Sequence, residues 1–247
     1  MKIYLKLFCL CFILSSVLLS SCKEKAEEKV PAHVLLITGG HDYDEENFSV
    51  LLSKLPMTYD HVKHPDAHAM LKSDQIAKYD LVLLFDMPKE ISEEAQADFI
   101  AMLEQGKGLV VFHHSFCSYD FWPEYTKIVG GRYHHFPWEK DGVEQPISFF
   151  KQNVIVNVKV EDADHPITNG VPDFQITDEV YGNTEMLSTI HPLLSTDIPT
   201  SGSLVCWTNQ YGNSRVVTFT LGHDRLAWEN PSFIQILSQS ILWAAGK

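Results

Sequence analysis

Residues 81–115 read LVLLFDMPKEISEEAQADFIAMLEQGKGLVVFHHS, and this stretch decides the fold. Leu81–Phe85 and Leu109–Phe112 are continuous apolar runs of strand length, which is typical of strands buried on both faces. Between them, a helix is expected to begin after its N-cap at Ser92 and to end at Gly106. Its buried stripe comprises Ala95, Phe99, Met102 and Leu103. The order strand, helix, strand predicts a βαβ unit with two parallel strands.

The alternation of apolar runs and helical periods continues on both sides of this unit. His33–Thr38 and Met57–Val62 are predicted to be two further buried strands, and a closing helix begins after Asn230. The second half of the chain carries little helix and adds strands at Val154–Val160, Leu187–Ile190, Leu204–Trp207 and Val216–Leu221. The sequence therefore predicts one α/β domain, with helices on the faces of a mostly parallel central sheet and antiparallel additions in the C-terminal half.

The composition is that of a folded domain with an acidic surface. Of the 247 residues, 45% are hydrophobic and 21% are charged, and 32 acidic against 19 basic side chains give a net charge of −13. Sequence-independent binding to a phosphate backbone needs a basic surface, which this balance does not provide. We therefore exclude nucleic acid as an expected partner, whereas the oligomeric state stays open.

The N-terminus is similar to the signal peptide of a bacterial lipoprotein. Lys2 and Lys6 precede an apolar run, Leu7–Leu19, that is too short to span a bilayer comfortably. Two serines then lead to Cys22, which is the arrangement that cleavage followed by acylation of the thiol requires. A plain secretory signal or an N-terminal anchor helix is the alternative.

Cleavage before Cys22 would divide the chain into three parts. These are a signal peptide at 1–21, an acylated cysteine with a charged tether at 22–32, and a single domain at 33–247. Loss of the two lysines of the signal would change the net charge from −13 to −15. Lipid on Cys22 would hold this acidic domain at a membrane outside the cytoplasm. Because Lys23 is not the aspartate that signals inner-membrane retention, the outer membrane of a Gram-negative bacterium is expected.

Two cysteines, Cys117 and Cys206, remain in the expected domain. They lie in different apolar contexts, so two buried thiols are favoured over one disulfide. No Gly-x-Ser-x-Gly motif follows Leu109–Phe112, where an α/β enzyme would hold a nucleophile. Cys117 is therefore expected to be a structural thiol rather than a nucleophile.

Ligands of an open parallel sheet bind at the carboxyl ends of its strands, and here these ends are rich in chemistry-bearing residues. The segments are Gly39–Glu46, Asp86–Pro88, His113–Cys117 and Gly222–Arg225. We expect His41, His113 or His114, and His223 to meet at one edge of the sheet. Imidazoles in one crevice suit acid/base catalysis near neutral pH, or a zinc-type divalent metal site with His41, His113 and His223 as candidate ligands. For each residue alone, a satisfied core histidine or an exposed one is the alternative.

A carboxylate pair and a long loop complete the candidate site. Asp178 and Glu179 are flanked by apolar residues, and Glu179 is expected to act as an acid or base or to orient a histidine, with a capping role as the alternative. The segment 133–150 has no period and is expected to be a flap over the site. The candidate substrate-binding residues are Gly40, His41, Asp42, Tyr43, Tyr181, Trp138 and His135, because glycines permit close approach and sugar rings stack on aromatic faces. Three other histidines, His61, His64 and His68, are expected at the surface.

Several motifs in a fixed order resemble those of the ThuA-like family, which is named for trehalose utilisation and whose fold is similar to that of class I glutamine amidotransferases. They are Gly39-Gly40-His41, Gly106–His114, Gly130-Gly131-Arg132, His165–Gly170, Asp178–Tyr181, Cys206–Thr208 and Tyr211–Asp224. The resemblance implies a flavodoxin-like three-layer sandwich. It also implies that His113 and His114 replace the amidotransferase cysteine and that His223 falls where the amidotransferase histidine would be. Glutaminase activity is therefore not expected.

The family is associated with the use of sugars and glycosides, including oxidised (3-keto) sugars. The resemblance therefore implies a glycoside or sugar derivative as the substrate class. Together with the candidate residues above, this predicts a protein that acts by hydrolysis or elimination, with His113, His114, His223 and Glu179 as the catalytic candidates. A non-catalytic carbohydrate-binding or scaffold lipoprotein is the alternative, and a metal-dependent hydrolase of another substrate class is a third. The expected partners are a small sugar or glycoside and, through Cys22, a membrane.

Overall fold

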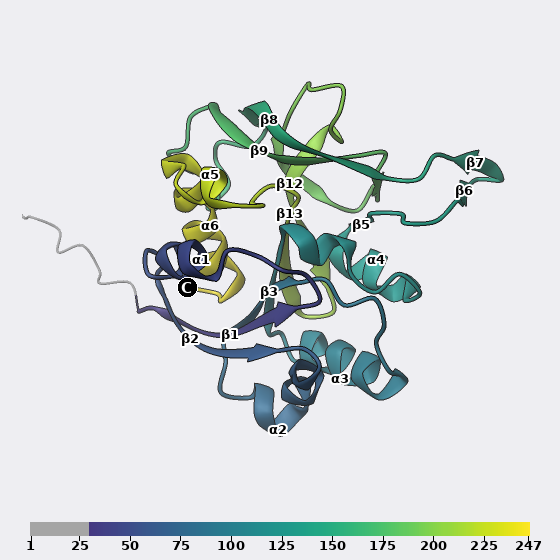
Figure 1. Ribbon diagram of the computed structural model, residues 1–247. Helices are drawn as coiled ribbons and strands as arrows, with labels where there is room; N and C mark the ends of the chain where they lie inside the picture. Colours follow the sequence, from purple (N-terminus) through teal and green to yellow (C-terminus); the bar gives the residue numbers. More distant parts are fainter. Residues whose placement is uncertain (1–29) are drawn as a thin grey trace, which may run out of the picture.

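A computed structural model describes residues 30–247 of the protein. The expected signal peptide, Cys22 and most of the tether lie outside the described residues. No helix in the described range is both long and apolar enough to cross a membrane. The chain is built around one nine-stranded sheet with the strand order β2-β1-β3-β4-β13-β12-β11-β8-β9 (Figure 1).

The sheet is parallel on one side and antiparallel on the other. The parallel strands are β1 (Ala32–Gly39), β2 (Met57–Lys63), β3 (Leu81–Asp86), β4 (Gly108–Phe112) and β13 (Ser214–Phe219). The antiparallel side consists of β12 (Leu204–Tyr211), β11 (His191–Ser195), β8 (Phe149–Val160) and β9 (Phe174–Gly182). Two small ribbons are added, one of β5 (Gly131–Arg132) with β10 (Glu185–Met186), and one of β6 (Trp138–Lys140) with β7 (Val143–Gln145). The prediction of a mostly parallel sheet with C-terminal antiparallel additions is confirmed.

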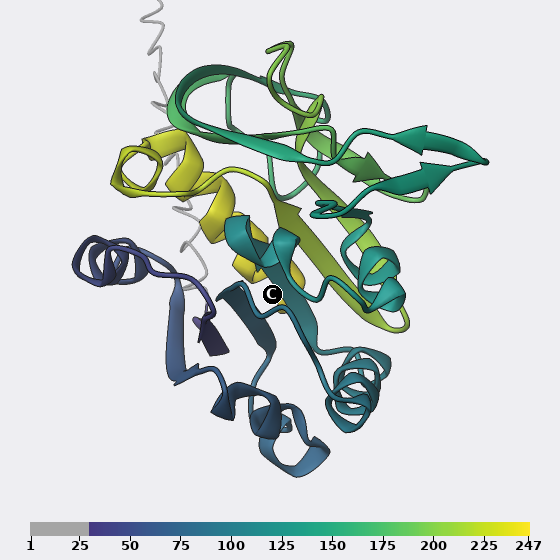
Figure 2. The same cartoon turned by 45° about the vertical axis from the view of Figure 1, so that its right-hand side comes forward.

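Helices cover both faces of the sheet and make it the middle one of three layers. They are α1 (Glu45–Leu52), α2 (Ser73–Ile76), α3 (Glu93–Glu104), α4 (Pro123–Val129), α5 (Arg225–Trp228) and α6 (Pro231–Ala244), with short 3-10 turns at Asp66–Leu71 and His113–Cys117. Figure 2 shows α6 on one face of the sheet and α3 and α4 on the other.

Successive side chains of a strand point to opposite faces of the sheet, so the buried strands contribute to two hydrophobic cores, one on each face. In β3, Leu81, Leu83 and Phe85 belong to the core under α1 and α6, whereas Val82 and Leu84 belong to the core under α3 and α4. The helix ends follow the sequence signals. Ser92 accepts a hydrogen bond from the Ala95 backbone, and Asn230 accepts from the Ser232 and Phe233 backbones. The predicted stripe of α3 is buried as expected.

Two of the predicted strands are wrong in burial or position. Met57–Val62 forms β2, but it is an edge strand whose residues are mostly exposed, because β1 pairs with one side of it and no strand within residues 30–247 pairs with the other. Leu187–Ile190 is not a strand, since β10 ends before it and β11 begins after it. Apolar character alone does not distinguish a buried strand from a connection that packs against the core.

The predicted structureless flap at 133–150 is also wrong in part. It contains the hairpin of β6 and β7, which projects from the body of the molecule in both views (Figures 1 and 2). Asp141 and Gly142 form its tip with positive φ angles of 52° and 76°, and an Asp-Gly pair is the usual sequence of such a turn. The prediction for the cysteines is confirmed, because Cys117 and Cys206 are both buried and unbridged.

Candidate active site

The candidate active site lies at the carboxyl ends of β4 and β13 and beside residues 178–181 of β9. Phe112 ends β4. The next residue, His113, has a φ of 49° and begins the 3-10 turn His113–Cys117. Beyond β13 the chain reaches His223 through Gly222. A side chain at Gly222 would place a Cβ 1.9 Å from the Phe112 ring, so only glycine lets these two segments lie this close together.

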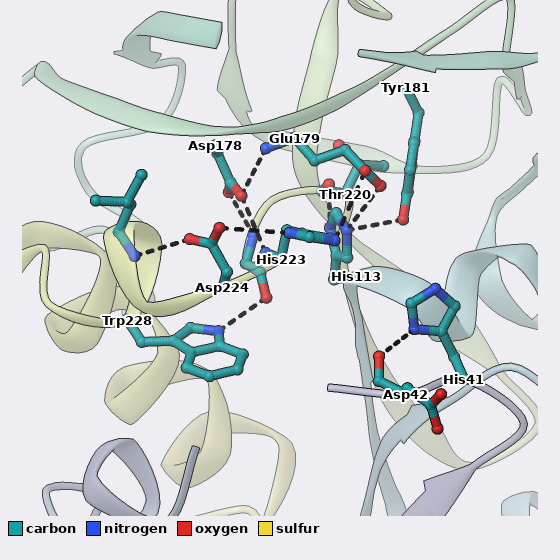
Figure 3. A network of polar contacts seen from close by, with 12 residues as sticks. His41, Asp42, His113, Asp178, Glu179, Tyr181, Thr220, His223, Asp224 and Trp228 are labelled. Atoms are coloured by element: carbon teal, nitrogen blue, oxygen red, sulfur yellow. Dashed lines mark hydrogen bonds and ion pairs between the residues drawn. The ribbon is translucent and has the colours of Figure 1, made fainter. Parts of the chain in front are cut away.

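His113 is fully buried, and its hydrogen bonds fix its tautomer. Its Nδ1 lies 2.8 Å from the Thr220 carbonyl oxygen, and because a carbonyl only accepts, Nδ1 carries the proton and donates it. Nε2 therefore presents its lone pair, and it accepts a 2.8 Å hydrogen bond from the Tyr181 hydroxyl. Burial lowers the pKa of His113 and keeps the ring neutral. Figure 3 shows these contacts around the ring.

Glu179 lies between two histidines. Its Oε1 is 3.4 Å from His113 Nε2, and its Oε2 is 3.7 Å from His223 Nε2. Burial acts to raise the pKa of Glu179, and His113, His223 and the Gln152 side chain together hold that pKa below its usual value. The contribution of His113 requires a proton or cation between its Nε2 atom and the carboxylate, because a lone pair and an ionised carboxylate repel each other.

Asp178 holds the polypeptide around this carboxylate in place. It is buried and accepts hydrogen bonds from the backbone N–H groups of Glu179, Gly222 and His223. Burial raises the pKa of Asp178 to about 7 against the opposing effect of these three donors. The residue ties the loop after β13 to β9 and so sets the position of the His223 ring relative to Glu179 (Figure 3).

His114 presents a nitrogen that nothing satisfies. The side chain is 5% exposed, and its Nε2 has no hydrogen-bond partner in the described part of the chain. Its ring stacks on His41 at a centroid distance of 4.0 Å. Burial, followed by the neighbouring imidazoles, lowers the pKa of His114 far below its usual value, so the ring is neutral. A buried imidazole nitrogen without a partner is costly unless it binds something.

One nitrogen or carboxylate oxygen from each of His113, His114, Glu179 and His223 can be chosen so that all four lie within 4.8 Å of one another. Three imidazoles with one carboxylate form a donor set that zinc-type divalent cations accept. The hydrogen bond from His113 Nδ1 to a backbone carbonyl is also the usual support of a ligating histidine. The buried cluster could therefore hold a metal ion. The ligand set differs from the predicted one, because His114 and Glu179 take part and His41 does not.

A cavity of about 200 Å³ opens beside this cluster. Its polar lining consists of His41, His114, His135, Gln152, Glu179 and His223, and its remaining wall of Met87, Cys117, Tyr133, Phe150 and Tyr181. Three predicted candidates, His41, His135 and Tyr181, thus lie at the cavity with the catalytic candidates. Burial raises the pKa of the Cys117 thiol, which favours its unreactive form over a nucleophilic thiolate.

Four predicted substrate-binding residues do not line this cavity. Gly40, Asp42 and Tyr43 line a separate depression of about 440 Å³ that shares only His41 with it. Gly40 has a packing role, since a Cβ there would lie 2.6 Å from the Met87 carbonyl group. Trp138 lies in the β6–β7 hairpin and does not line the cavity. Its ring stacks on His134 at a centroid distance of 3.9 Å, and its indole N–H donates a hydrogen bond to the Pro146 carbonyl oxygen.

Several residues of the cavity wall were not predicted individually. Met87 lies in the predicted strand end Asp86–Pro88 and Phe150 in the predicted flap 133–150, but neither was given a role. Gln152 was missed, because no local pattern distinguishes it from other residues of β8. Two histidines predicted to lie at the surface are partly buried instead. His64 Nε2 lies 2.8 Å from Asp86, and His68 Nε2 lies 3.1 Å from the Tyr119 hydroxyl.

Comparison with known proteins agrees with this architecture. With 22% identity and a TM-score of 0.73, a ThuA-like protein from Parabacteroides merdae aligns over 88% of this chain and 91% of its own. A ThuA-like protein from Bacteroides uniformis has 19% identity and a TM-score of 0.64, over 87% and 92% of the two chains. PurLQS from Thermotoga maritima has 17% identity and a TM-score of 0.55, over 86% and 98%. A search of curated proteins found no significant match.

These likenesses define the class as a flavodoxin-like, amidotransferase-like α/β fold. The family model described as "ThuA: Trehalose utilisation" matches residues 33–244. The chain therefore belongs to the ThuA family.

Proposed function

We propose that this ThuA-family protein is an enzyme that acts on a glycoside or an oxidised sugar by hydrolysis or elimination. The observation that carries the proposal is the convergence of His113, His114, Glu179 and His223 beside one small cavity. Buried groups of this kind, unpaired or closely coupled and open to a cavity, are characteristic of catalytic sites. The family description links the chain to sugars.

In this proposal Glu179 is the general base, because its pKa lies below the usual value and its carboxylate is ionised at neutral pH. It would accept a proton from a water molecule in hydrolysis, or from the carbon next to a sugar carbonyl in elimination. His223, on the open side with 21% of its side chain exposed, would donate a proton to the leaving oxygen. Asp178 would keep these two groups in register through its backbone contacts.

As the alternative to these proton-transfer roles, we propose that the cluster binds a zinc-type divalent cation, in which case Glu179 and His223 act as ligands instead of as base and acid. The ligands would be His113 and His114 through their Nε2 atoms, together with Glu179 and His223. Such a cation would polarise a carbonyl group or lower the pKa of bound water. Binding would require the Tyr181 hydroxyl to give up its hydrogen bond to His113 Nε2.

The test of catalysis is turnover of a sugar panel followed by mass spectrometry of the products. The panel holds trehalose, maltose, cellobiose and their 3-keto forms, and hydrolysis adds one water to the summed product mass whereas elimination does not. We expect Glu179→Gln to abolish turnover and the surface variant Glu161→Gln to retain it. Wild-type rates in Glu179→Gln would refute the proposed base. A sugar that raises the melting temperature but stays intact would favour the carbohydrate-binding alternative.

We further propose that the protein is an extracytoplasmic lipoprotein, held at the outer membrane through Cys22. The support is the sequence of residues 1–22. Metabolic labelling with a fatty acid, compared between the wild type and Cys22→Ala, tests it. Label in both proteins, or in neither, would contradict this anchor.

A further inference from the structure

The cavity beside the histidine cluster has room for only part of a glycoside. Its volume of about 200 Å³ lies below the roughly 300–1,000 Å³ that is common for ligand pockets. One sugar ring is a suitable occupant, so the rest of a two-ring substrate must lie outside the cavity. The question is which surface next to the cavity receives it.

A pair of exposed aromatic rings lies on one side of the cavity. Phe121 is 73% exposed and Phe136 is 54% exposed, and the rings stack on each other at a centroid distance of 5.7 Å. Phe136 directly follows His135, which lines the cavity. Two large apolar rings that stack on each other while exposed to solvent do not pack into a hydrophobic core. Such an exposed apolar patch marks a binding surface.

The loop that carries Phe121 is fixed rather than free. Arg132 donates hydrogen bonds to the carbonyl oxygens of Tyr119 and Asp120, and the Tyr119 N–H donates to the Pro88 carbonyl. Tyr119 itself has a φ of 57°, a conformation that a tyrosine adopts only when its surroundings enforce it. The ring of Phe121 is therefore presented to solvent by a pre-organised segment.

A separate groove of about 260 Å³ lies at Phe121. Its lining includes Lys89, Gln96 and Phe121. Lys89 Nζ lies 3.0 Å from His135 Nε2, and His135 Nδ1 lies 2.6 Å from Asp120, so one chain of contacts separates groove from cavity. The amine and amide of Lys89 and Gln96 can hydrogen-bond hydroxyl groups while Phe121 offers an apolar face.

We propose that Phe121 and Phe136, with Lys89 and Gln96, form a second subsite that receives the distal sugar ring of a glycoside whose first ring occupies the cavity. The inference rests on the proposed function. A pyranose has an apolar C–H face and a polar rim, which match an exposed aromatic ring bordered by hydrogen-bonding side chains. The depression next to His41 offers the charged pair of Glu45 and Lys63 and only the half-buried ring of Tyr43, and so suits a neutral sugar less well.

The experiment compares two-ring and one-ring sugars by isothermal titration. The probes are trehalose, maltose and cellobiose, with glucose as the ring that all three share. The variants are Phe121→Ala, Phe136→Ala and the control Tyr59→Ala, which removes an aromatic ring that is 41% exposed on the distant edge strand β2. We expect Phe121→Ala to weaken binding of the best disaccharide by about fivefold or more and to change glucose binding by less than about twofold.

Failures of the two proposals are distinguishable. If the wild type binds none of the four sugars and none of the 3-keto forms, with or without added Zn²⁺, the proposed function fails and the subsite with it. If the wild type binds them and Phe121→Ala changes disaccharide and glucose affinity equally or not at all, the subsite alone is refuted. Unchanged sugar affinities together with loss of self-association in Phe121→Ala, measured by sedimentation, would assign the rings to a contact between copies of the chain instead.

Discussion

Two histidine clusters lie at the same edge of the sheet, and they differ in how their polar atoms are arranged. In the cluster after β2 and β3, each contact is one to one, with His64 against Asp86 and His68 against Tyr119. In the cluster after β4 and β13, four side chains converge on one point beside a cavity. The first arrangement uses its polar groups to hold segments together, whereas the second brings three imidazoles and a carboxylate, including the unpaired Nε2 of His114, to one point.

The unpaired Nε2 of His114 makes this contrast concrete, because the ring is buried and neutral and yet bonded to nothing in residues 30–247. Asp86 also has one unpaired oxygen, Oδ1, but its other oxygen is engaged by His64. Histidines near a strand end therefore identify a functional site only where their free atoms converge and a ligand can reach them.

The largest expected effect is on turnover of the sugar that the proposed assay identifies. His113→Ala removes the ring that links Thr220, Tyr181 and Glu179, so kcat/KM should fall by about 10²-fold to 10⁴-fold. His64→Ala, which removes a partly buried histidine from the other cluster, should keep kcat near the wild-type value if circular dichroism shows it folded. Equal losses in the two variants would remove the functional distinction between the clusters.

A smaller effect is expected from Tyr181→Phe, which deletes only the hydroxyl that binds His113 Nε2. If a cation uses the same lone pair, loss of this competitor should leave Zn²⁺ affinity unchanged or raise it by about two- to tenfold, the equivalent of one hydrogen bond. Competition with a chromogenic chelator measures that affinity. Weaker Zn²⁺ binding in the variant would mean that the phenol supports the ligand set rather than competing with it.

The smallest effect concerns the pH dependence of stability in the cluster after β2 and β3. Burial, followed by the charge of His64, lowers the pKa of His68 below 6.5. The unfolded chain therefore binds the proton more readily, and the contribution of this residue is present above pH 6.5 and lost as the pH falls through the lowered pKa. Below pH 6.5 the stability difference between wild type and His68→Gln should shrink, by less than about 1.4 kcal/mol per pH unit.

Urea unfolding of both proteins at pH 5 and pH 8 measures this difference. A difference that grows as the pH falls would contradict the sign and would mean that protonated His68 is stabilised in the folded state.

Much of the fold was predictable because local signals and tertiary structure agree. The uninterrupted apolar runs at β3 and β4 can be buried only in the middle of a sheet, and Ser92 and Asn230 mark helix starts through contacts made within three residues. The prediction that Met57–Val62 is a buried strand was wrong, because an edge strand and a central strand can have the same apolar residues. Only the neighbouring elements decide which one forms.

The site was predictable to the level of strand ends and no further. His113, His114 and His223 follow strands, so sheet topology brings them together, and Glu179 was included because its acidic pair is flanked by apolar residues. The choice of His114 over His41 as a candidate ligand depends on ring orientation, which no spacing encodes. Phe150 lines the cavity and Phe121 lines the neighbouring groove. Their positions follow only from tertiary packing.

We have proposed that His113, His114, Glu179 and His223 form one metal-binding catalytic centre. The most direct measurement is the metal content, by inductively coupled plasma mass spectrometry, of the protein purified without chelator, beside His114→Ala and the control His68→Ala. The account predicts near-stoichiometric divalent metal in the wild type and in His68→Ala, and its loss in His114→Ala. Metal retained in His114→Ala, or absent from a wild type supplied with Zn²⁺, would contradict it.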